Sequence, residues 1–211
     1  MKRYLMVLSG GMDSVTMLHD YRDCIAAAVT FQYGSNHNRR EARCARLNCE
    51  KLGIEWIEVD LSFMSTLFES SLLQGAEAIQ DGHYCEDNMR STVVPFRNGI
   101  MLAVAAGLAE SRNFDGVMLA NHSGDHAIYP DCRPEFVKSM GAAIHDGTYD
   151  HLELVAPYTH MTKGQIAMRG KELGVDYSLT YSFYKGGEHH CGKCGTCIER
   201  AEALAYAGIT L

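Results

Sequence analysis

A phosphate-binding turn is indicated near the start of the chain by the run Ser9-Gly10-Gly11-Met12-Asp13-Ser14. It lies between an apolar segment, typical of a buried strand, and a helical pattern that begins at Val15. Glycines lack a Cβ and let a phosphate approach the main chain, while the amides of a helix N-terminus favour an anion. Asp13 would repel that phosphate unless a cation lay between them, so we expect it to hold Mg²⁺ or to cap the helix. The alternative is an ordinary Asp or Ser N-cap.

A metal site is indicated near the other end by Cys191, Cys194 and Cys197, which are spaced by three and separated by glycines. Three thiolates need a fourth ligand to close a tetrahedral zinc site, and the nearest candidates are His189 and His190. An iron–sulfur cluster is the alternative, because it also uses closely spaced cysteines. The other five cysteines are scattered, at Cys24, Cys44, Cys49, Cys85 and Cys132.

Further polar residues lie where a binding crevice would need them. Arg97 and Asn98 open an apolar helix, with a surface arginine and an Asn cap as the simpler interpretation. Residues 121–126 and 129–136 are rich in polar groups and follow a strand, as expected at the crevice of an open α/β sheet. Lys163 lies in the first turn of a helix capped by Thr162, where the helix dipole disfavours a cation. It therefore either faces a phosphate or is simply exposed.

The elements that would position these residues alternate between strands and helices. The pattern predicts strands at 4–8, 24–31, 54–61, 116–120 and 152–156. It also predicts a short helix at 67–73 within an irregular segment over 62–92, a kind of segment that often forms a mobile lid over a site. Longer helices are predicted from Val15, and at 39–52, 100–110, 136–145, 162–173 and 198–207. This order predicts an α/β fold: a Rossmann-like, open, five-stranded and mainly parallel sheet with helices on both faces. Residues 1–211 are expected to form one domain that includes a metal-binding segment at 182–211.

Composition narrows the class of protein. With 46% hydrophobic and 21% charged residues, the chain is ordinary for a soluble globular protein. The net charge of −7 argues against broad nucleic-acid binding and favours a small-molecule substrate. We find neither an apolar run of membrane-spanning length nor a secretory signal, so a cytoplasmic location without a membrane partner is expected.

The turn at residues 9–14 resembles the PP-loop of the ATP pyrophosphatases, which split ATP into AMP and pyrophosphate. It is neither a Walker A loop nor a dinucleotide-binding turn. Taken together, four stretches resemble the family of 7-cyano-7-deazaguanine synthases, the preQ0-forming enzymes of the queuosine pathway. They are the PP-loop, Pro95-x-Arg97-Asn98, the run from Tyr129 to Phe136, and the terminal Cys-Gly-x-Cys-x-x-Cys.

The resemblance implies a reaction of ATP, ammonia and 7-carboxy-7-deazaguanine through adenylated intermediates, with Mg²⁺ and Zn²⁺ as cofactors and a homodimer as the assembly. It places the nucleotide on Leu8, Ser9, Gly10, Gly11, Met12, Asp13 and Ser14, with Asp13 and Lys163 as catalytic residues. Candidates for the deazaguanine and its carboxylate are Arg97, Asn98, Asp131, Arg133 and Glu135. A carboxylate such as Asp131 or Glu135 suits the guanine-like N1–H and amino edge.

One position departs from the family pattern. The family's zinc site has a fourth cysteine in an upstream Ser-Cys-Tyr segment, where this chain has Ser182-Phe183-Tyr184. Phenylalanine cannot bind a metal, so we expect a Cys₃His site with Cys191, Cys194, Cys197 and His190, or with His189 instead. A water ligand and a weak site are the alternatives.

The substitution also leaves room for a variant that stops at the 7-amido product. Two further alternatives exist. One is a PP-loop tRNA thiolase, which the acidic charge and the lack of a basic appendage disfavour. The other is a catalytically silent nucleotide-binding module, and the intact PP-loop argues against it.

Overall fold

The computed structural model describes residues 2–75, 89–184 and 190–210. Its centre is a parallel five-stranded sheet in the order β3-β2-β1-β4-β5, as the sequence predicts. The strands are β1 (Tyr4–Val7), β2 (Ile25–Gln32), β3 (Glu55–Asp60), β4 (Gly116–Met118) and β5 (Glu153–Val155).

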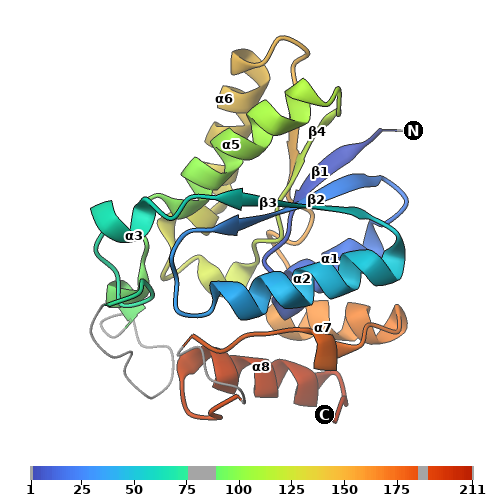
Figure 1. The fold of residues 1–211 in the computed structure, drawn as a ribbon. Helices are drawn as coiled ribbons and strands as arrows, with labels where there is room; N and C mark the ends of the chain where they lie inside the picture. Colours follow the sequence, from blue (N-terminus) through green and yellow to red (C-terminus); the bar gives the residue numbers. More distant parts are fainter. Residues whose placement is uncertain (1, 76–88, 185–189, 211) are drawn as a thin grey trace.

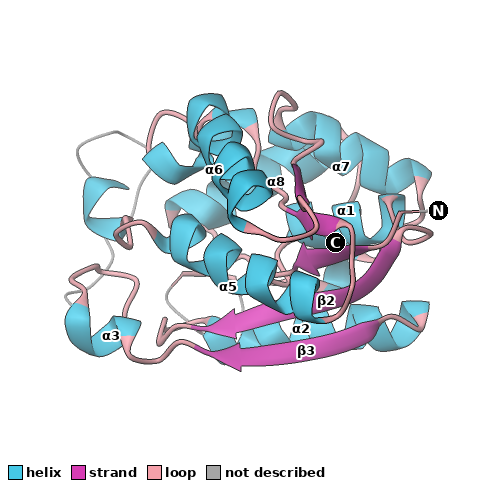
Figure 2. Cartoon of the chain, turned by 90° about the horizontal axis from the view of Figure 1, so that it is seen from above, coloured by secondary structure: helices cyan, strands magenta, loops and turns pink. Residues whose placement is uncertain are grey.

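Helices cover both faces of this sheet, which confirms the predicted layers (Figures 1 and 2). One face packs against α1 (Met12–Asp20), α2 (Asn38–Leu52), α7 (Lys163–Glu172) and α8 (Gly195–Tyr206). The other face packs against α5 (Arg97–Ser111) and α6 (Pro134–Gly147). Neighbouring residues of β1 alternate between the two cores, since Leu5 packs with α5 and Met6 with α1.

The predicted segment between β3 and α5 is only partly described. The short helix expected at 67–73 lies earlier, as α3 (Met64–Leu67), and residues 71–73 are not helical. Leu72 and Leu73 are instead buried in the core on the α5 side of the sheet. Residues 76–88, which include Cys85, lie outside the described part of the chain.

One stretch of the described chain, Arg90–Ser111, is long and apolar enough to cross a membrane by length and composition. It contains α5, whose Leu102, Ala105 and Ala109 are fully buried against the sheet. Burial in a core accounts for this apolar character, so we interpret α5 as a core helix.

The order of the strands determines where a ligand can bind. Strand β1 connects through α1 to β2 on one side, while β4 pairs with β1 on the other. The chain therefore reverses its direction of winding between β1 and β4. In open parallel sheets, such a point leaves a crevice at the carboxyl ends of the strands.

Candidate functional site

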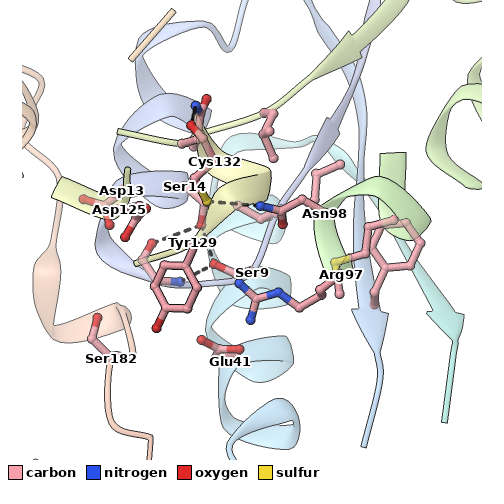
Figure 3. A pocket seen from close by; sticks show the side chains of 18 of the residues that line it. Ser9, Asp13, Ser14, Glu41, Arg97, Asn98, Asp125, Tyr129, Cys132 and Ser182 are labelled. Atoms are coloured by element: carbon pink, nitrogen blue, oxygen red, sulfur yellow. Dashed lines mark hydrogen bonds between the residues drawn. The ribbon is translucent and has the colours of Figure 1, made fainter. Parts of the chain in front are cut away.

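A cavity lies at the predicted crevice and is lined by the segments that follow β1 and β4 (Figure 3). Residues of α2, α5, α7 and α8 complete its wall. Its lining includes Leu8, Ser9, Gly11, Asp13, Ser14, Tyr33, His37, Glu41, Arg97, Asn98, Asn121, His122, Asp125, Tyr129, Cys132, Lys163, Tyr184 and Thr196.

The predicted phosphate-binding turn opens onto this cavity. Gly11 is the N-cap of α1, and no side chain caps this helix, so the alternative of an Asp or Ser N-cap is wrong. Two backbone amides of the turn already donate hydrogen bonds to serine hydroxyls. The Gly10 amide donates to Ser14 Oγ at 3.2 Å, and the Gly11 amide donates to Ser9 Oγ at 3.1 Å. A phosphate would have to exchange with these hydroxyls, which themselves lie 3.0 Å apart.

Gly10 allows α2 to pack closely on the turn. Gly10 has a φ of +92°, and a Cβ there would lie 2.1 Å from the Glu41 carbonyl oxygen of α2. Its missing side chain therefore admits the backbone of α2 rather than a phosphate. Leu8 lines the cavity, whereas the Met12 side chain is fully buried in the core between the sheet and α1.

Asp13 lies beside polar side chains from other parts of the fold. Its Oδ2 lies 3.5 Å from Lys163 Nζ and 3.6 Å from His122 Nε2. Lys163 Nζ also donates to Glu199 Oε2 of α8 at 2.7 Å. Burial alone would lower the pKa of Lys163, but Asp13 and Glu199 raise it above its ordinary value. With only 13% of its side chain exposed, Lys163 is not the surface lysine of the simpler interpretation.

Asp13 also fits the cation expected from the sequence. Its Oδ1 is one of few buried side-chain polar atoms in the described chain that lack a hydrogen-bond partner. A buried carboxylate oxygen without a donor is costly unless a ligand satisfies it, and Mg²⁺ prefers carboxylate oxygens. The donor set at this point therefore fits Mg²⁺.

The substrate candidates separate into two groups. Arg97 and Asn98 line the cavity, and Arg97 Nη1 donates to the Tyr33 hydroxyl at 3.3 Å. Asp131, Arg133 and Glu135 are not among the lining residues. The Asp131 carboxylate instead accepts a hydrogen bond from the backbone N–H of Asn98 at 2.8 Å, at the start of α5, while Arg133 and Glu135 are exposed.

The three clustered cysteines converge as the sequence predicts. Their sulfur atoms all lie within 4.8 Å of one another, and the Cys191 and Cys197 Sγ atoms are 3.9 Å apart. A tetrahedral site with Zn–S bonds of about 2.3 Å needs sulfurs about 3.8 Å apart, so this spacing fits zinc. Burial raises the pKa of the Cys191 thiol, but amide hydrogen bonds from Lys193 and Cys194 outweigh it and lower this pKa below its ordinary value.

The structure does not bring His190 into this group. Among the described residues, only the three cysteines form the cluster of possible ligands. The His190 side chain is exposed, and its Nε2 accepts the Ser182 amide at 3.3 Å. His189 lies outside the described residues. Phe183 packs against the cysteines and is 6% exposed.

Comparison with known proteins decides the family. The family model described as "Queuosine biosynthesis protein QueC" matches residues 3–208. The chain belongs to the QueC family. A 7-cyano-7-deazaguanine synthase from Porphyromonas gingivalis is 56% identical over 99% of this chain and 94% of its own length. One from Desulfotalea psychrophila is 50% identical over 96% of this chain and 93% of its own length.

Solved structures show the same fold as this QueC chain at low sequence identity. An NMN synthetase from Francisella tularensis superposes with a TM-score of 0.51 at 14% identity, over 100% of this chain and 79% of its own. A predicted subunit of tRNA methyltransferase from Methanocaldococcus jannaschii has a TM-score of 0.50 at 10% identity, over 82% of this chain and 76% of its own. At these identities the likeness concerns the fold alone.

Sequence reasoning missed part of the cavity of this QueC chain. Glu41 and His37 of the α2 region line it beside Tyr33. Burial raises the pKa of Glu41 to about 8, against the opposing effect of Arg97, and burial with Arg97 lowers the pKa of His37 to about 4. Figure 3 shows the guanidinium of Arg97 and the carboxyl group of Glu41 pointing toward the same part of the cavity.

Proposed function

We propose that this chain is a C–N-forming ligase that converts 7-carboxy-7-deazaguanine and ammonia to 7-cyano-7-deazaguanine at the expense of ATP. The observation that carries the proposal is the convergence of the PP-loop turn, Asp13, Lys163 and Arg97 on one cavity, in a chain that matches QueC over 3–208. The homodimer and the cytoplasmic location expected from the sequence stay predictions.

The proposed reaction needs two adenylations. The carboxylate attacks the α-phosphorus of ATP and displaces pyrophosphate, and ammonia then displaces AMP from the acyl adenylate, losing a proton to give the amide. The amide oxygen attacks a second ATP in the same way. Loss of AMP and the remaining N–H protons forms the nitrile. No step requires a nucleophilic side chain, so the protein contributes positioning, electrostatic stabilisation and exclusion of water.

The residues at the PP-loop would stabilise the leaving pyrophosphate. The Gly10 and Gly11 amides, the Ser9 and Ser14 hydroxyls and the Lys163 ammonium are donors that can face its oxygens. Mg²⁺, when bound, would neutralise part of the charge that develops on the pyrophosphate. Asp13 is positioned to hold that ion, because its Oδ1 is buried and unpartnered among the described atoms.

Arg97 and Glu41 would recognise the deazapurine acid. Arg97 is half-buried and lines the cavity, and the centroid of the Tyr33 ring lies 5.5 Å from its Cζ. A guanidinium in this setting suits a carboxylate. Asp131 and Glu135 do not line the cavity, so we assign the guanine-like edge to Glu41. Both groups of that edge are donors, so they would pair with the ionised carboxylate and would oppose the burial that raises the pKa of Glu41 to about 8.

The overall reaction is tested by AMP release and by mass spectrometry of the product. We expect AMP formation that depends on 7-carboxy-7-deazaguanine and a product with the mass of the nitrile. AMP release that instead depends on tRNA would indicate a thiolase, and a final product with the mass of the amide would indicate the variant that stops early. A protein that never consumes ATP with the acid present would refute the proposal.

The role of Arg97 is tested by comparing two substrates. Arg97→Met should lower kcat/KM for the acid by roughly 10- to 150-fold, the equivalent of about 1.5–3 kcal/mol for a charged hydrogen bond. The amide intermediate carries no carboxylate, so the same variant should lower kcat/KM for the amide much less than for the acid. Arg133→Met is the matched control, because Arg133 is exposed outside the cavity. Equal losses with both substrates would contradict the assignment.

A further inference from the structure

A fourth thiol lies at the cysteine cluster, and it comes from a distant part of the sequence. The apolar cluster around Cys194 and Cys197 also contains Phe183, and both Cys191 and Cys44 pack against it. Cys44 belongs to α2, almost 150 residues before the other cysteines. It is half-buried and forms no disulfide.

The orientation of α2 explains this position. Asn48, one turn after Cys44, donates to the Leu179 carbonyl oxygen at 2.9 Å and to the Cys44 carbonyl oxygen at 2.9 Å. This helix face therefore lies along the segment that leads from Leu179 to Phe183. Residues four apart share a helix face, so the Cys44 side chain is directed to the same segment as Asn48.

The other candidates are less well placed. Phe183 has no donor atom, and its ring occupies the apolar cluster beside the cysteines. His190 is exposed and already accepts a hydrogen bond from the Ser182 amide. Cys44 alone among these residues both carries a metal-binding atom and packs against the apolar cluster that contains Tyr181, Phe183, Cys194 and Cys197.

We propose that Cys44 supplies the fourth thiolate of a Cys₄ zinc site, completed by Cys191, Cys194 and Cys197. The spacing of Cys191 and Cys197 already matches a tetrahedral edge. Cys44 packs on this group but is not one of the sulfurs within 4.8 Å of one another, so the ion would draw it inward from packing contact. The inference concerns the metal site and is independent of the reaction proposed above.

The surrounding charge suits four thiolates. A Zn²⁺ ion with four thiolates carries a net charge of −2, whereas a Cys₃His site carries −1. The Arg200 guanidinium, only 5% exposed, lies three residues after Cys197 and donates to Thr180 Oγ1 and to the Tyr177 carbonyl oxygen at 2.7 Å each; Asp13, Cys197 and Cys44 are among the groups that interact with it electrostatically. A fixed buried cation offsets part of the charge that a fourth thiolate would add.

X-ray absorption spectroscopy of the zinc-loaded protein tests the proposal directly. We expect four sulfurs at about 2.3 Å from zinc, against three sulfurs and one nitrogen or oxygen at about 2.0–2.1 Å for a Cys₃His or Cys₃-water site. Finding the second set in the wild-type protein would overturn the proposal. So would protein purified without chelator that contains less than half a zinc per chain. Neither measurement depends on catalytic activity.

Variants locate the fourth sulfur. Cys44→Ala should weaken Zn²⁺ binding by on the order of 100-fold or more, because ligand losses exceed the 10- to 100-fold cost of outer-shell changes. The same variant should lose one sulfur from the absorption spectrum. Cys24→Ala is the matched control, since Cys24 is also half-buried but contacts the Tyr21 carbonyl oxygen far from the cluster. His190→Ala should leave both measurements unchanged.

A rescue variant separates loss of a ligand from loss of folding. The double variant Cys44→Ala/Phe183→Cys removes the thiol at position 44 and introduces one at position 183, whose side chain lies in the same apolar cluster as Cys194 and Cys197. We expect zinc content and four-sulfur coordination to return. A Cys44→Ala protein with unchanged zinc affinity and an unchanged sulfur count would refute the assignment.

Discussion

Replacing Gly10 with alanine should destabilise the protein by more than the backbone strain of a positive φ alone. At a φ of +92°, any L-residue is strained, at a cost of about 1–2 kcal/mol. The new Cβ would also lie 2.1 Å from the Glu41 carbonyl oxygen and 2.9 Å from the Ala45 amide nitrogen. Both atoms belong to the backbone of α2, which must move, adding about 1–3 kcal/mol or more. The total is about 2–5 kcal/mol.

Urea unfolding of wild-type protein and of two variants measures this. Gly53→Ala is the matched control, because Gly53 also has a positive φ of +68° but would meet no atom within 4 Å. It should cost only the backbone strain, so the two variants should differ by about 1–3 kcal/mol in the free energy of unfolding. Equal destabilisation would refute the reasoning, since it would mean that α2 does not pack closely on the turn.

Two further predictions concern charges of the cavity. Burial raises the pKa of Glu41 from near 4.5 to about 8, so the unfolded chain loses this proton first and stability falls as the pH rises from 5 to 8. Glu41→Gln should remove up to about 3 kcal/mol of that decline, measured by unfolding at several pH values. If both proteins decline equally, Glu41 does not carry the effect. Lys163→Met should destabilise the fold by about 2–3 kcal/mol, because it removes the ammonium that lies between the carboxylates of Asp13 and Glu199. It should slow AMP formation by on the order of 100-fold, whereas Lys138→Met, on an exposed position, should do neither.

The sequence pattern predicted the strands, the turn after β1, the parallel sheet and the convergence of the three cysteines. The strands and the turn after β1 follow from apolar runs interrupted by glycine, and the parallel sheet follows from the alternation of strands with helices. The cysteine spacing predicted three converging sulfurs because a turn of glycines brings i, i+3 and i+6 together. The turn after β1 and the cysteine cluster are each specified by a short, continuous stretch of sequence.

The cavity wall could not be predicted in this way, because it is assembled from distant segments. Arg133 and Glu135 are close in sequence to lining residue Cys132, but α6 begins at Pro134 and both side chains are exposed. Glu41 reaches the cavity only because α2 packs on the turn at Gly10. One signal was available: Glu41 shares the helix face of Ala45 and Asn48, which are buried, and a carboxylate on a buried face is uncommon.

The metal segment and the nucleotide turn are parts of one structure. Thr196 lies between Cys194 and Cys197 and lines the cavity, and Glu199, two residues after Cys197, holds Lys163 beside Asp13. The Tyr181 amide, at the start of the segment that packs on the cysteines, donates to the Gly10 carbonyl oxygen at 3.0 Å. An ion that fixes Cys194 and Cys197 would fix the first turn of α8, and with it the position of Glu199. A ligand on α2 would also hold in place the helix that carries Glu41. The same ion would then connect both walls of the cavity, which gives a physical reason for a metal site outside the cavity to affect the ATP binding that we propose within it.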